Sequence, residues 1–172
     1  MPDLQKILLM LFLKAAPQDL SYSKPLAVQL VAAYVFSGII VIQTMFEPDD
    51  MIGSLLLGLF IQFAFVYLVL QALSHRSRFL QTFCAVMGIG TVFNFLSWPI
   101  FSMMSDAMTD DALKSSLSLL FLMLVSWEVL VKAYIFRHAL EIKMFSAMAL
   151  SFSLFFISIA LSQLFFPAQV AG

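Results

Sequence analysis

The chain of 172 residues is 62% hydrophobic and only 11% charged, with a formal net charge of −1. Soluble domains are typically about 45–50% apolar and about 25% charged. The composition therefore excludes an ordinary water-soluble protein and indicates an integral membrane protein. The small net charge gives no electrostatic basis for binding nucleic acid. We expect the chain to contact membrane lipids and no nucleic acid.

The first twenty residues are too short and too interrupted to cross a membrane. In residues 2–15, Asp3 and Lys6 precede a dense apolar patch that Lys14 closes. This pattern predicts an amphipathic helix at the membrane interface within residues 1–20, followed by a connection. A disordered leader is the alternative. A cleaved signal peptide is not expected, because Asp3 offsets Lys6 and no Ala-x-Ala site follows.

Five apolar runs follow, each long enough to cross a hydrocarbon core about 30 Å thick. Ser23 and Pro25 suit the start of the first run as N-cap and first-turn residues. Pro99 is expected to kink or terminate the third run near Trp98. The predicted fold class is all-α, a polytopic membrane bundle of five transmembrane helices plus the interfacial helix. It forms one membrane domain, 1–172, with spans at about 25–45, 51–73, 79–104, 115–136 and 144–166.

Charges alternate in sign from one connection to the next. The first and third connections between spans are acidic, and the N-terminal segment and the other two connections are basic. Because Lys and Arg are retained in the cytoplasm during insertion, the basic connections are expected there. This predicts a bacterial inner-membrane protein with a cytoplasmic N-terminus and a periplasmic C-terminus. The acidic residues are Glu47, Asp49, Asp50, Asp106, Asp110 and Asp111; the basic ones are Lys6, Lys14, Lys24, Arg76, Arg78, Arg137 and Lys143.

Small residues recur at helical spacing within several spans. Such residues let helices approach closely in lipid, where packing rather than hydrophobicity drives association. We interpret them as helix-packing surfaces. They are Ser54 and Gly58 in the second span, Gly88 and Gly90 in the third, and Ala147, Ser151, Ser158 and Ser162 in the fifth.

Glu128 and Lys132 interrupt the apolar fourth span, and Asn94 interrupts the third. A spacing of four places Glu128 and Lys132 on one helix face in the favourable order. One interpretation is an ion pair that positions the helix, with Glu128 in the cytoplasmic half of the span. The other is a buried carboxylate that takes up a proton, an ion or a partner's basic group. Asn94 is either a helix–helix hydrogen bond or part of a polar path.

The tryptophan-containing fourth span, the short basic turn after it and the Ser/Ala-rich fifth span resemble the Yip1-like family of five-span membrane proteins. That family's "DLYGP" signature is missing, and "QDLSYSKP" at residues 18–25 is its nearest equivalent. With "RFLQTF" at residues 78–83, this segment is also similar to small proteobacterial inner-membrane proteins of unassigned function. Either resemblance implies membrane organisation or partner binding, and it transfers no functional residue.

No catalytic group, cofactor site or metal site is expected, since the only cysteine, Cys84, lies in an apolar run and neither histidine belongs to an HExxH pair. The function predicted first is a non-enzymatic membrane scaffold or accessory subunit. It would bind other integral membrane proteins, or a second copy of itself, through its helix faces. The alternative is a small proton- or ion-coupled transporter that uses Glu128. A lipid-modifying enzyme would need a cluster of catalytic side chains.

Overall fold

The computed structural model describes residues 2–43, 48–105 and 110–166, and every regular element in these ranges is helical. A short helix, α1 (Asp3–Leu11), and two 3₁₀ turns, η1 (Pro17–Asp19) and η2 (Arg76–Arg78), accompany five long helices. All five are long and apolar enough to cross a membrane, which confirms the predicted fold class of an integral membrane protein. They are α2 (Lys24–Ile42), α3 (Pro48–Ala72), α4 (Phe79–Ser105), α5 (Asp111–Leu140) and α6 (Met144–Phe165).

The helices follow the predicted spans closely, with two differences. α5 extends four residues beyond the predicted span at each end, because the helix continues through polar residues that end the apolar run. α4 continues past Pro99 to Ser105, so the proline does not terminate it. Neighbouring helices can compensate for one missing backbone bond within a membrane. The predicted end of the first span, at residue 45, lies outside the described residues.

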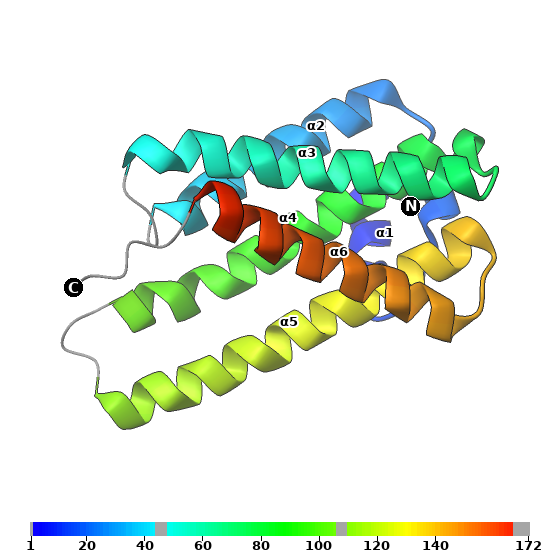
Figure 1. Cartoon of the computed structure of the whole chain (residues 1–172). Helices are drawn as coiled ribbons and strands as arrows, with labels where there is room; N and C mark the ends of the chain where they lie inside the picture. The colour runs from blue at the N-terminus through cyan, green and yellow to red at the C-terminus, as the bar shows by residue number, and fades with distance from the viewer. Residues whose placement is uncertain (1, 44–47, 106–109, 167–172) are drawn as a thin grey trace.

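α4 is the centre of the bundle (Figure 1). It packs against α2, α3 and α5, and α6 completes the bundle by contacting α5 and α3. In the most apolar window of α4, 56% of the residues are buried, against 17–28% in the other four long helices. α4 therefore supplies most of the protein core, and the remaining helices leave large apolar surfaces for lipid.

The two ends of the bundle differ in charge and in packing. η2, the turn between α5 and α6, and the N-terminal segment lie at one end, called here the basic end (Figure 1). The opposite end, where α3 and α5 begin, is called the acidic end. Among the described residues, every apolar side chain that is at most 1% exposed belongs to α1 or to the half of the bundle nearer the basic end. That half is therefore closely packed.

Arg78, in η2, joins this turn to the end of α5 at the basic end. Its guanidinium donates to the carbonyls of His138 (3.3 Å) and Ala139 (3.1 Å), and it forms a 2.5 Å ion pair with Glu141. These contacts satisfy carbonyls at the end of α5 that have no partner within the helix. The hydrogen bond and positive charge of Arg78 hold the pKa of Glu141 below its usual range.

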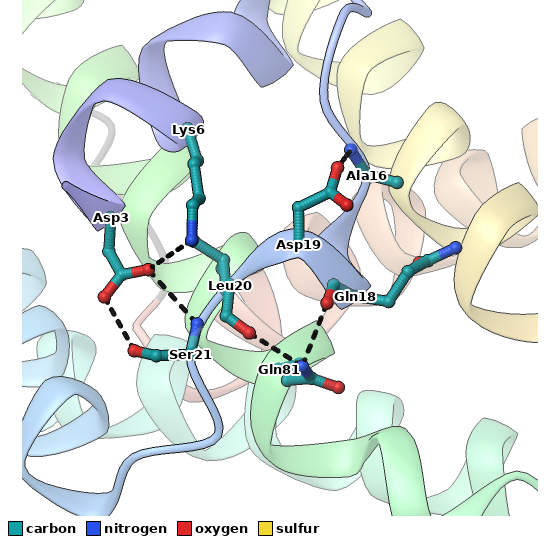
Figure 2. Close-up of polar contacts among 8 residues, drawn as sticks. All are labelled: Asp3, Lys6, Ala16, Gln18, Asp19, Leu20, Ser21 and Gln81. Atoms are coloured by element: carbon teal, nitrogen blue, oxygen red, sulfur yellow. Dashed lines mark hydrogen bonds and ion pairs between the residues drawn. The ribbon is translucent and has the colours of Figure 1, made fainter. Parts of the chain in front are cut away.

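The N-terminal segment packs across the outside of α4. Ser21 donates to Asp3 from its hydroxyl (2.6 Å) and from its backbone N–H (3.1 Å), which together with nearby Lys6 lowers the pKa of Asp3 (Figure 2). Gln81 donates to the carbonyls of Gln18 and Leu20, tying the connection to α4 (Figure 2).

The two faces of α1 have different surroundings. One face is buried in the bundle and carries Ile7, Met10 and Leu11. The other exposes the apolar side chains Leu4, Leu8 and Phe12. In an amphipathic helix at a membrane interface the exposed apolar face contacts lipid.

Candidate intramembrane polar site

A cavity of about 200 Å³ lies among all five long helices. Each helix contributes at least one polar side chain to it, although the helices are otherwise strongly apolar. The contributing positions are near the middle of α2, α3, α4 and α6. The polar lining residues are Tyr34 (α2), Gln62 (α3), Asn94 (α4), Glu128 and Lys132 (α5), and Ser151 and Ser158 (α6).

Glu128 and Lys132 form an ion pair on one face of α5. The distance between Lys132 Nζ and Glu128 Oε1 is 2.6 Å, and the two side chains are 14% and 27% exposed, respectively. The spacing that the sequence shows therefore does bring the two charges together. Both residues also line the cavity, so Glu128 has a lysine of its own helix on one side and the cavity beside it.

Tyr34 and Gln62 join α2 to α3 across the cavity. Gln62 Nε2 donates to the Tyr34 hydroxyl oxygen, which leaves the hydroxyl hydrogen available to another acceptor. Gln62 is only 6% exposed, and among the described residues no group bonds to its buried Oε1. Exchanging the amide nitrogen and oxygen would still leave one of them unpaired. An unpaired buried amide group costs about 1–3 kcal/mol, so this side chain favours a polar occupant nearby.

Gly90 makes the position of Tyr34 possible. A side-chain carbon at Gly90 would lie 2.8 Å from Cε2 of the Tyr34 ring, closer than such contacts allow. α2 and α4 can therefore pack tightly while the tyrosine hydroxyl extends toward α3. Gly58, on α3, faces the same hydroxyl with room to spare, at 4.0 Å.

Asn94 connects α4 to α2 and borders the cavity. Its Nδ2 donates to Ser37 Oγ at 3.0 Å, and Ser37 is almost completely buried. Ser97, one turn further along α4, donates to the Asn94 carbonyl. Asn94 thus makes an interhelical hydrogen bond and also lines the cavity, while its place in a polar path stays a prediction.

The predicted packing residues occupy several different environments. Ser151 is buried and donates to the Val129 carbonyl on α5, while Ala147 is fully buried nearby. Ser158 lines the cavity and bonds within its own helix; Ser54 and Ser162 are half-buried. Gly88 contacts Ile7 of α1 rather than another long helix.

Sequence reasoning selected Glu128, Lys132 and Asn94 but missed Tyr34 and Gln62. Both were visible as polar residues inside apolar runs, and Gln62 carries the only side-chain amide between residues 51 and 70. The rotation of each helix about its axis, which decides whether a polar side chain faces lipid or the bundle, could not be derived from the sequence. Gln29, for example, is exposed on α2.

The chemistry available at the site is proton uptake, ion exchange and hydrogen bonding. Within the described ranges there is no group of three or more His, Cys, Asp or Glu residues that could hold a metal ion. Of the residues that the structure describes, Glu128 is the only carboxylate that lines the cavity and Lys132 the only cation. Comparison with protein-family models, curated proteins and solved structures finds no match for this chain.

Proposed function

We propose that the protein is a small proton- or ion-coupled transporter in which Glu128 is the exchanging group. The observation that supports this most is the convergence of polar side chains from all five long helices on one internal cavity. Ionisable residues within membrane spans are costly and typically mark ion or proton pathways.

The size of the cavity favours a proton or a small ion as the transported species. Sites for drug-sized ligands are about 300–1,000 Å³, whereas this cavity is about 200 Å³. At about 30 Å³ per water molecule it has room for about six waters. A short water chain of this kind can carry protons to and from a carboxylate.

Protonation of Glu128 would change the state of the whole site. The ion pair with Lys132 would lose its attraction, leaving an uncompensated ammonium in a partly buried position. A lysine side chain can extend toward the nearer membrane surface, which here is at the basic end. Glu128 and Lys132 therefore form a two-state element that a proton could switch.

The proposed setting is the bacterial inner membrane, with the basic end in the cytoplasm. The support is the asymmetric distribution of Lys and Arg among the connections. With five spans, the N-terminus would then be cytoplasmic and the C-terminus periplasmic.

Proton flux into liposomes tests the proposal. Purified protein is reconstituted with a trapped pH-sensitive dye, and a potassium diffusion potential drives proton entry. We expect flux from the wild-type protein and none from Glu128→Gln. The double variant Glu128→Gln/Lys132→Met is expected to fold well and still carry no protons, because it is neutral but lacks the exchanging carboxylate.

Glu141→Gln is the matched control, since Glu141 is an exposed carboxylate paired with Arg78 outside the spans. It should retain wild-type flux. The proposal fails if wild-type liposomes match empty ones, or if Glu128→Gln carries protons normally. Recovery of flux in the double variant would also overturn it, because the pair would then act only in holding α5.

A second candidate, a scaffold that binds another membrane helix or a second copy, is favoured by a separate feature. An apolar groove of about 640 Å³ runs between α4 and α5 in the half nearer the acidic end. Side chains from a partner helix can fill such a groove by close packing. Its lining residues are Leu96, Pro99, Ile100, Met103, Leu117, Leu120, Met123, Leu124 and Trp127.

Crosslinking distinguishes this candidate. In a Cys84→Ala background, a cysteine at Leu120, which is half exposed in the groove, should capture a second chain or a membrane partner. A cysteine at Phe156, an exposed position on α6, is the control for random collisions. Equal crosslinking at the two positions would remove the support for a scaffold.

A further inference from the structure

A second cavity, of about 210 Å³, adjoins the central one. The two share Asn94, Glu128 and Phe155, so these three residues form the boundary between them. All but one of the other lining residues of the second cavity lie on the acidic-end side of this boundary. They are Val41 on α2, Ser97 and Phe101 on α4, and Phe121, Leu124 and Val125 on α5; the remaining lining residue, Phe93, directly precedes Asn94 on α4.

The space around Glu128 is therefore asymmetric along the bundle. Toward the acidic end it continues into the second cavity. Toward the basic end the next turns of α5 carry Val131, Ile135 and Phe136, all fully buried. Arg78 and Gln81 fasten the helices and the N-terminal segment at that end. The second cavity therefore extends from Glu128 away from the basic end, whereas the central cavity extends only as far as Lys132 on α5 before this packed region.

The polar side chains that line the second cavity are those of Ser97, Asn94 and Glu128. Ser97 is 8% exposed and bonds to the Asn94 carbonyl, and Asn94 borders the same space as Glu128. Beyond Ser97, the rings of Phe101 and Phe121 approach to 4.7 Å between centroids. Apolar constrictions of this type close a pathway to ions by excluding water.

We propose that the second cavity is the route by which water and small cations reach Glu128 from the acidic end, and that Phe101 and Phe121 close it. Ser97 and Asn94 supply the polar steps between this closure and the carboxylate. The proposal rests on the transport function above, to which it adds a direction of access. The packed basic half separates Glu128 from the opposite side of the membrane in the same conformation.

Silver ions provide a small thiol-reactive probe of this route. In a Cys84→Ala background, Ser97→Cys is exposed to Ag⁺ from one side of sealed vesicles, with a thiol scavenger trapped inside. Unreacted thiol is then counted with a maleimide dye after denaturation. We expect Ser97→Cys to react from the acidic-end side, and at least several-fold faster when Phe121→Ala is added. Phe121→Trp should slow the reaction, so the result does not depend on a single variant.

Two controls match the test positions. Val131→Cys replaces a buried side chain three residues from Glu128 on the basic side and should stay unreactive from either side. Phe152→Ala removes an exposed phenylalanine of α6 and should leave the rate at Ser97→Cys unchanged. All variants are first checked for a single folded species by size-exclusion chromatography.

Three results would overturn the route. They are no reaction at Ser97→Cys even with Phe121→Ala, equal acceleration by Phe152→Ala, and faster reaction of Val131→Cys from the basic side. The test is independent of proton flux. If Ser97→Cys is labelled from the acidic-end side but proton flux does not depend on Glu128, the access route stands and the transport function is rejected. If proton flux depends on Glu128 but Ser97→Cys is not labelled, only the access route is rejected.

Discussion

At the scale of single residues, Glu128 and Lys132 matter because they share one helix. Their 2.6 Å contact needs no other element to form, and α5 alone fixes its geometry. Breaking a buried pair by removing one partner is costly because the other charge remains. Removing both partners leaves no uncompensated charge.

This difference predicts the outcome of a double-mutant cycle on stability. Glu128→Gln and Lys132→Met should each lower the free energy of unfolding by up to about 3 kcal/mol. The combined variant should recover most of that loss. Reversible unfolding in mixed detergent micelles measures all four proteins. Additive losses in the double variant would show that the two residues act independently.

At the scale of elements, the distinctive contact is that of α1 with α4 and α5. Ile7 packs on the bare backbone of Gly88, and the Trp127 indole donates to the Leu11 carbonyl at 3.1 Å. Phe12 and Phe93 both contact the Trp127 ring. A helix of nine residues is marginal alone in water, so these contacts hold α1 in place.

Enlarging Gly88 should therefore release α1. A side-chain carbon at residue 88 would lie 2.8 Å from the end of the Ile7 side chain. Ile7 could shift enough to admit a single methyl group, but not enough to admit a leucine side chain. We expect Gly88→Leu to increase hydrogen exchange across residues 3–11 at least tenfold.

Two variants check this expectation. Gly58→Ala should have no such effect, because its nearest neighbour is 4.0 Å away. Adding Ile7→Ala to Gly88→Leu should restore part of the protection. Unchanged exchange in Gly88→Leu would mean that the Gly88 contact does not hold α1.

At the scale of the whole molecule, the alternation of basic and acidic connections predicts the orientation. Reporter fusions provide the measurement. An alkaline phosphatase fused after the last residue should be active, since it would fold in the periplasm, and a cytoplasmic fluorescent protein fused there should be dark. Fusion of the phosphatase after residue 143 should give no activity. The opposite pattern would reverse the predicted orientation, and both ends of the bundle would need reassigning.

The fold could be predicted well from the sequence, because apolar runs of about 20 residues leave few alternatives in a bilayer. The ion pair could also be predicted, since it depends only on spacing within one helix. The cavity could not. It depends on how five helices rotate and pack, and the residues that complete it, Tyr34 and Gln62, come from α2 and α3, far along the chain from Glu128 on α5. The resemblance to Yip1-like proteins stays a prediction.

The same-helix position of Lys132 has a consequence for how the protein is made. A span with a lone carboxylate would enter the membrane at a penalty of about 2.5–3.5 kcal/mol, and would have to wait for another helix to neutralise it. α5 carries its own counter-charge one turn away, so it can partition into lipid as a neutral unit before α6 is synthesised. The two charged residues of the central cavity can therefore enter the bilayer already paired.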